Sequence, residues 1–212
     1  MDTEGELLLI TLEGIDGSGK SSLHVSLGQL LSDLNPVITR EPGATWVGEA
    51  VRRAIAEQID PVTEATLFVA DHAAHLATII RPALSQGRLV ISDRYSDSRF
   101  AYQSVTLDGV IPEPERWLRE MHNGWSVVPD KTFLLVLPVE DALSRLKPAS
   151  EREHFEKREV LERVQNNYLE YARREPTRFV VVDALKEKEE ISQFVAISIR
   201  QFLQSSRSRR RS

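Results

Sequence analysis

Short apolar runs alternate with longer amphipathic segments along this chain. The runs contain many Val and Ile residues and do not alternate cleanly with polar residues, which is typical of strands buried on both faces of a parallel sheet. They cover residues 7–12, 37–38, 89–91, 133–137 and 179–182. Apolar residues at helical spacing predict helices over residues 22–34, 64–84, 113–121, 160–173 and 188–203.

This alternation of strands and helices predicts an α/β fold of three layers, with a five-stranded parallel sheet flanked by helices. Neither an internal repeat nor a long linker interrupts the pattern, so we expect one domain over residues 1–205. Residues 206–212 are rich in arginine and are expected to form a disordered, solvated basic tail. The alternative for this tail is a tether for RNA or another anionic surface.

Composition narrows the classes of function. The formal net charge is -5, which disfavours a dedicated nucleic-acid binder, so no nucleic-acid partner is expected. The chain has no cysteine and therefore no disulfide, thiolate nucleophile or zinc–thiolate site. Its N-terminus is acidic, and no apolar run reaches the roughly 18 residues of a membrane span. We expect a cytoplasmic protein without a membrane partner.

Residues 14–21 match the phosphate-loop pattern G-x-x-x-x-G-K-[ST] and lie between a predicted strand and a predicted helix. Glycines let the backbone turn its N–H groups toward phosphate oxygens, and the start of the helix favours negative charge. The pattern assigns Lys20 to the β- and γ-phosphates and Ser21 to Mg2+. This motif predicts that the chain binds a nucleoside triphosphate, and it makes Lys20 a candidate catalytic residue.

Asp93 and Arg94 follow the predicted strand at residues 89–91, at the edge where α/β sheets bind their ligands. A carboxylate there suits Mg2+ and its waters, and a planar guanidinium suits two phosphoryl groups. The alternative is an internal ion pair at the end of a strand. The chain contains no Asn-Lys-x-Asp motif, which disfavours a GTPase.

Residues 145–158 are densely charged and break the alternation of strands and helices. The segment is either a solvated connection or a short cationic lid over an anionic substrate, and the phosphate loop favours the lid.

Three further motifs accompany the phosphate loop in order: Thr-Arg-Glu-Pro-Gly at residues 39–43, Leu-Phe-Val-Ala-Asp at 67–71, and Asp-Arg-Tyr-Ser-Asp-Ser-Arg-Phe-Ala-Tyr-Gln at 93–103. Together they make the chain, from about residue 7 to residue 203, resemble the thymidylate kinase family of P-loop kinases. The resemblance implies ATP-dependent phosphorylation of dTMP to dTDP for dTTP biosynthesis, with Mg2+, ATP and dTMP as partners. It also implies a homodimer.

The resemblance implies a role for each matched residue. Phe68 would stack on thymine, Arg94 would hold the dTMP phosphate, and Tyr102 would favour a deoxyribose. Residues implied to bind dTMP are Asp16, Arg40, Pro42, Phe68, His72, Arg94, Ser98, Tyr102 and Gln103. Those implied to bind ATP are Gly14, Ile15, Asp16, Gly17, Ser18, Gly19, Lys20, Ser21, Ser22 and Arg145. Ser21 and Asp93 are the expected metal ligands.

Some family members carry a catalytic arginine in the phosphate loop, where this chain has Gly17. The missing cation is therefore expected from the lid, as Arg152 or Arg158, in addition to Lys20 and Arg94.

The chain also departs from the family pattern at His72, where an arginine that donates to thymine O4 is usual. Two alternatives to a dTMP kinase therefore stay open: a kinase for another nucleotide or deoxynucleoside, with dUMP as one example, and a nucleotide-binding module with weak transfer.

Overall fold

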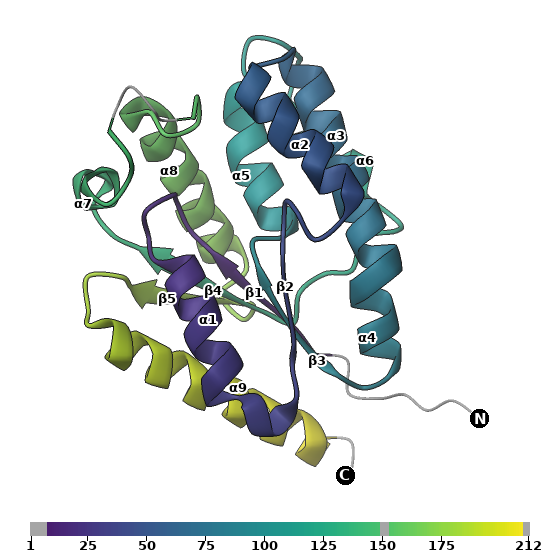
Figure 1. The fold of residues 1–212 in the computed structure, drawn as a ribbon, viewed down its shortest axis with the longest axis vertical. Helices are drawn as coiled ribbons and strands as arrows, with labels where there is room; N and C mark the ends of the chain where they lie inside the picture. Colours follow the sequence, from purple (N-terminus) through teal and green to yellow (C-terminus); the bar gives the residue numbers. More distant parts are fainter. Residues whose placement is uncertain (1–7, 149–152, 210–212) are drawn as a thin grey trace.

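The computed structural model describes residues 8–148 and 153–209. At its centre is a parallel sheet of five strands in the order β2-β3-β1-β4-β5 (Figure 1). This confirms the predicted α/β fold. The strands are β1 (Leu8–Glu13), β2 (Val37–Arg40), β3 (Leu89–Asp93), β4 (Lys131–Val136) and β5 (Phe179–Asp183).

Strands β1 and β3 form the middle of the sheet, and every residue in both is buried. Leu8 pairs with Leu89 and Leu12 with Asp93, so the two strands end together at one edge. The backbone N–H of Arg94 donates to the Leu12 carbonyl at 3.0 Å. The register thus brings together the two chain segments that carry the phosphate motifs.

Helices cover both faces of the sheet. Helix α1 (Lys20–Leu30) packs against α9 (Lys188–Arg209) on one face, and α5 (Ser96–Thr106) packs against α8 (Arg158–Arg174) on the other (Figure 1). The remaining helices are α2 (Trp46–Glu57), α3 (Pro61–His75), α4 (Arg81–Ser85), α6 (Pro114–His122) and α7 (Val139–Ser144). A single 3-10 turn, η1 (Ser32–Leu34), follows α1.

The helix predicted over residues 64–84 is interrupted. Between α3 and α4 lies a π-helical turn, η2 (Leu76–Ile80), which widens the backbone just before Pro82. Proline has no N–H to donate, and its ring would collide with the carbonyl four residues earlier. The wider turn accommodates the ring without ending the helical run.

The prediction did not include α2, α5 or the short α7. The signal for α2 was present, because Thr45 caps its first turn by accepting from the Gly48 N–H at 3.2 Å and its apolar residues follow helical spacing. Helix α5 gives no such signal. It buries polar side chains such as Asp97 and Gln103 together with apolar ones, so its sequence lacks the separate polar and apolar faces by which a helix is predicted.

Helix α9 reaches Arg209, past residue 206, where the basic tail was expected to begin, and residues 210–212 lie outside the described chain.

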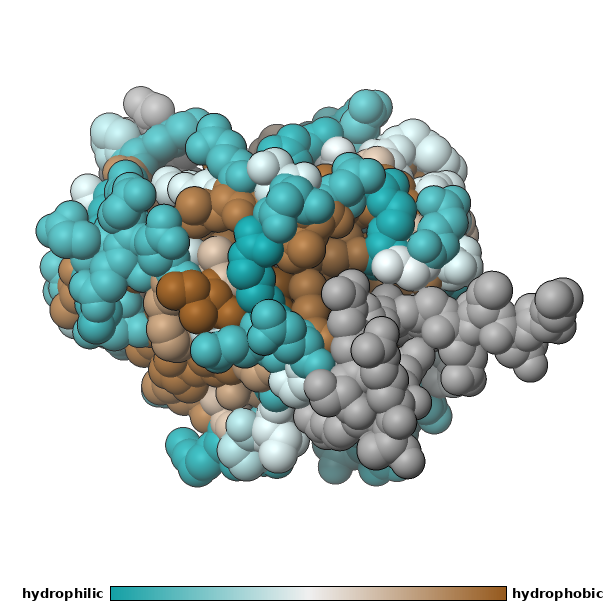
Figure 2. Space-filling model, turned by 90° about the horizontal axis from the view of Figure 1, so that it is seen from below, coloured by the Kyte–Doolittle hydropathy of each residue, from teal (hydrophilic) through white to brown (hydrophobic). Residues whose placement is uncertain are grey.

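The surface on the side of α9 mixes hydrophobic and hydrophilic residues, as Figure 2 shows. Phe194 and Ile197 of α9 are exposed. Within residues 8–148 and 153–209, no helix combines the length and apolar character that crossing a bilayer requires.

Candidate functional site

The phosphate loop connects β1 to α1 and depends on three glycines. Gly14, Gly17 and Gly19 have φ angles of 139°, 81° and 96°, a region that side chains other than glycine rarely adopt. The loop ends at Lys20, the first residue of α1, so the free N–H groups of that helix start face the loop. This arrangement can hold an anion.

Lys20 is buried, and its ammonium donates to the Ile15 carbonyl at 2.8 Å and to Ser18 Oγ at 3.3 Å. Burial, with repulsion from the Arg94 guanidinium, lowers the pKa of Lys20 to about 8. Lys20 and Arg94 therefore face one small region, and among the described contacts only Arg94 forms an ion pair with a carboxylate, that of Asp16. A polyphosphate would supply the missing negative charge.

The surroundings of Gly17 leave no space for an arginine side chain at this position of the loop. A Cβ atom on Gly17 would lie 2.3 Å from the Ala142 carbonyl oxygen, and its positive φ adds strain. The Arg145 guanidinium lies beside this point instead, with Nη1 3.4 Å from the Gly17 carbonyl and Nη2 3.5 Å from that of Ala184. Arg145 thus brings a cation to the outer rim of the loop.

Ser21 and Asp93 meet across the sheet edge, where Ser21 Oγ donates to Asp93 Oδ2 at 2.8 Å. One hydroxyl and one carboxylate suit Mg2+, which keeps several waters and takes its other ligands from phosphates. Among the described residues no group of three or more acidic, His or Cys side chains could hold a metal ion by itself. The donor set thus fits an ion that arrives with a nucleotide.

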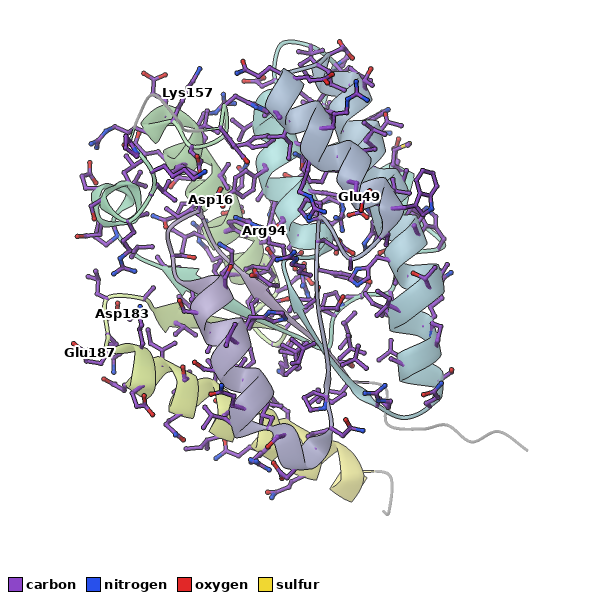
Figure 3. All side chains as sticks on the ribbon, in the orientation of Figure 1. Asp16, Glu49, Arg94, Lys157, Asp183 and Glu187 are labelled. Atoms are coloured by element: carbon purple, nitrogen blue, oxygen red, sulfur yellow. The ribbon has the colours of Figure 1, made fainter. Side chains whose placement is uncertain are left out.

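Arg94 and Asp16 face one another at the centre of the site (Figure 3). Arg94 has a φ of 66°, an uncommon conformation that directs its side chain back over the phosphate loop. Its guanidinium donates to the Asp16 carboxylate, to Ser98 Oγ at 3.1 Å and to Tyr102 Oη at 3.3 Å. Tyr102 in turn donates to Asp16 Oδ2 at 2.8 Å.

Two cavities meet at this cluster. The first, about 730 Å³, runs from the phosphate loop past Arg145 to the β5–α9 connection. The second, about 430 Å³, lies between α2, α3 and α5. Asp16, Arg40, Glu41 and Arg94 line both. The volumes suit two small organic anions whose charged ends meet at these shared residues.

The second cavity is a slot with aromatic walls. Phe68, Pro42 and Tyr102 line it, and Phe155 of the predicted lid closes one side. Phe155 makes edge contacts with Phe68 at 6.5 Å and Tyr102 at 5.9 Å between ring centroids. Ser98 and Gln103 also line this slot, as expected of base-binding residues.

Some predicted residues lie elsewhere. Gly14 and Ile15 line neither cavity and offer backbone carbonyls to Arg94 and Lys20. His72 was expected in the base pocket, but it is fully buried behind the slot, within hydrogen-bonding distance of Glu41 and Ser126.

Of the two lid arginines, Arg152 lies outside the described residues. Arg158 is half exposed and pairs with Glu140 and Glu162 rather than lining either cavity. The structure also places at the site several residues for which the sequence analysis predicted no role. Those in the second cavity are Glu41, Arg52, Ile55, Arg99, Glu153 and Phe155. Glu41 and Arg99 belong to the motifs at residues 39–43 and 93–103, and this membership was the signal in the sequence that could have identified them as site residues.

Glu13 lies directly behind the phosphate loop and is fully buried. It accepts from the Tyr95 N–H at 2.8 Å, from Ser98 Oγ at 2.5 Å and from Tyr168 Oη at 2.8 Å. Burial, with repulsion from Asp97, nevertheless raises the pKa of the Glu13 carboxyl to about 7. The folded protein therefore holds a proton that the unfolded chain releases near pH 4.5.

This raised pKa gives a testable pH dependence. The stabilising contribution of Glu13 is fully present below pH 4.5 and is lost as the pH rises to about 7. Glu13→Gln does not titrate, so we expect the variant to gain stability relative to the parent between pH 5 and pH 8, by up to about 3 kcal/mol. Urea unfolding at each pH measures the difference, and two parallel stability curves would contradict the prediction.

Comparison with known proteins agrees with this geometry. The family profile described as thymidylate kinase matches residues 12–195. A probable thymidylate kinase of Methanoculleus marisnigri is 67% identical over 96% of this chain and 100% of its own length. One from Methanospirillum hungatei is 56% identical over 91% of this chain and 94% of its own length.

A crystal structure of thymidylate kinase from Ehrlichia chaffeensis superposes with a TM-score of 0.69 at 30% identity, covering 92% of this chain and 98% of that one. The matches span the phosphate loop, the slot and the sheet together, and they do not favour a different acceptor or a binding module without transfer. The chain therefore belongs to the thymidylate kinase family, and it is a phosphotransferase that acts on dTMP.

Proposed function

We propose that the first cavity binds ATP, the second binds dTMP, and the γ-phosphoryl group crosses at the four residues that line both. That shared boundary carries the proposal, because transfer requires two phosphate groups to lie within reach of one another. Arg145, beside the β5–α9 connection, is the adenine contact. Phe68 stacks on thymine with Pro42 beside it, and Tyr102 leaves no space for a ribose 2′-hydroxyl.

The reaction needs no general base from the protein, because the nucleophile is a phosphate oxygen of dTMP that is anionic at neutral pH. Charge repulsion between the two nucleotides is the main obstacle. Lys20, which lines only the first cavity, and Arg94, which lines both, reduce it. Asp16 holds the Arg94 fork and is within reach of the deoxyribose. The two cations thus align and neutralise the reacting groups.

The Ser21 hydroxyl and the Asp93 carboxylate would hold Mg2+, directly or through its waters. When bound, the ion neutralises charge on the ATP phosphates.

The segment over residues 145–158 acts as the lid. Phe155 already packs on the slot, and Glu153 lines it, so this connection covers the dTMP cavity. Closure excludes water, which would otherwise accept the phosphoryl group. Arg152 or Arg158 then supplies the third cation; for Arg158 this requires exchange of its surface partner Glu140, a modest cost for an exposed pair.

An acceptor panel tests this function. With ATP and Mg2+ present, dTMP, dUMP, dCMP, UMP and thymidine are each supplied, and formation of ADP and of the phosphorylated acceptor is measured. We expect dTMP to give the highest kcat/KM and thymidine to give none, because the site needs an acceptor phosphate at Arg94. Preference for thymidine or for a ribonucleotide would contradict the proposal.

The family resemblance also implies a cytoplasmic homodimer, which we propose for this chain. Trp46 at the start of α2 is 79% exposed, and a partner subunit would cover such a side chain. Light scattering in solution should give the mass of two chains.

A further inference from the structure

Arg99 is a buried charged residue that the proposed reaction does not use. It comes from α5, one residue after Ser98, and only 2% of it is exposed. Tyr102 and Gln103 follow three and four positions later, so all three share one face of the helix. That face lines the slot.

Arg99 lines only the second cavity, whereas Arg40 and Arg94 line both. It therefore lies away from the phosphate boundary, toward the part of the slot that would hold the base. Arg52 also lines only this cavity, but it is exposed, so water already satisfies its donors. Arg99 is the guanidinium that the protein has removed from water here.

Three buried neighbours fix the orientation of Arg99. Its Nη1 donates to Glu41 Oε2 at 2.5 Å, and its Nε donates to His122 Nε2 at 3.1 Å. Nη2 lies 2.8 Å from His72 Nδ1, and the same ring nitrogen lies 2.9 Å from Glu41 Oε1. His72 Nδ1 accepts from Arg99 in the tautomer protonated at Nε2, and donates to Glu41 in the other. Burial, with repulsion from Arg99, lowers the pKa of His72 to about 4 and that of His122 to about 3. Both imidazoles are therefore neutral at pH 7, and His122 Nε2 accepts from Arg99 Nε.

These contacts leave part of the fork unpaired. A guanidinium has five N–H donors, and each of the three nitrogens of Arg99 directs at most one of them to a neighbour within the described chain. Nη1 and Nη2 thus keep one N–H each, on a side chain that lines the slot. Unpaired buried donors are unfavourable, so these N–H groups favour an acceptor on a ligand bound in the slot.

We propose that Arg99 determines base specificity, donating to the carbonyl oxygen at position 4 of a pyrimidine base. The residue at position 72 then acts as a positioning residue for Arg99 rather than as the donor. The inference rests on the proposed function, since it assumes that dTMP lies in the slot. A pyrimidine with an amino group at position 4 would present hydrogens to the fork, so dCMP should be rejected.

The test compares Arg99→Lys with the parent on dTMP, dUMP and dCMP at saturating ATP. Lysine keeps the charge toward Glu41 but loses the planar fork. We expect kcat/KM for dTMP to fall about 10- to 100-fold, mainly through KM, with KM for ATP unchanged. The dTMP/dCMP preference should fall by a similar factor. The dTMP/dUMP preference should stay, because both bases carry the same carbonyl.

A second variant tests the same inference in case Arg99→Lys does not fold. If Arg99→Lys does not fold, Arg99→Gln combined with Glu41→Gln removes both buried charges together, and the same ratios are measured. An equal loss for all three acceptors would show a structural role only and would overturn the inference. So would an unchanged dTMP/dCMP ratio. A parent protein inactive on dTMP would instead contradict the proposed function.

Discussion

Replacement of Lys20 by methionine should lower kcat about 10³-fold while the protein stays folded. The phosphate-loop pattern assigns this ammonium to the β- and γ-phosphates, and its charge cannot come from elsewhere in the loop, since Gly17 has no room for a side chain. Burial and Arg94 already disfavour the charged form of Lys20 in the absence of a ligand, which is why its pKa is lowered to about 8. Methionine fills similar volume without that charge.

The stability of the variant is therefore as informative as its activity. We expect the melting temperature of Lys20→Met to be equal to or higher than that of the parent, because the lost contacts to Ile15 and Ser18 are offset by relief of charge burial. Steady-state kinetics and thermal unfolding measure the two effects. Lys131→Met, at the start of β4, is the matched control and should change kcat by less than about twofold. Activity of Lys20→Met near that of the parent would refute the role of this loop.

Replacement of Arg94 should lower kcat nearly as much, because it removes the planar guanidinium fork as well as the positive charge. We expect both Arg94→Met and Arg94→Lys to lose about 10²- to 10³-fold in kcat, because an ammonium cannot span two phosphoryl groups as the planar fork does. Arg94→Lys with activity within about threefold of the parent would show that charge alone suffices.

Stability separates the structural role of Arg94 from its role in transfer. Burial alone would raise the pKa of Asp16, but Arg94 and Lys20 outweigh burial and lower it. Arg94→Met removes the main partner of that carboxylate and should destabilise the fold by about 1–3 kcal/mol. Adding Asp16→Asn should recover most of the stability but none of the activity. Arg116→Met, whose partners Glu113 and Glu120 are exposed, is the control and should alter neither quantity appreciably.

Local signals in the chain were enough to predict the strands and the phosphate loop. Buried strands of a parallel sheet are apolar along their whole length, and the loop needs glycine at fixed positions for backbone reasons. Both features depend on neighbouring residues, so they can be read without the fold. The same holds for Ser21, which belongs to the phosphate-loop pattern, and for Asp93, which follows a predicted strand at the edge where ligands bind.

Helix α5 could not be predicted in this way, because its polar residues are buried by tertiary contacts. Asp97 bonds to Arg178 of the loop before β5 at 2.6 Å, and Arg99 bonds to Glu41 after β2. These partners are 81 and 58 positions away. A periodicity argument expects such residues on a solvated face, so it gives no helix here. The segment was recognised only through its family resemblance.

The sequence by itself determined the fold class, the phosphate loop and the family, since these follow from local pattern and ordered motifs. Only the tertiary structure decided which guanidinium faces the base slot. Position 72 carries a histidine, and read alone it weakens the expectation of pyrimidine binding. Packing of α3 against α5 buries that histidine in its neutral form and brings Arg99 to the slot, where a carboxylate that follows a different strand, Glu41, holds it. Neither the burial of His72 nor the pairing of Arg99 with Glu41 can be predicted from the sequence alone, because both depend on contacts between segments that are distant in sequence.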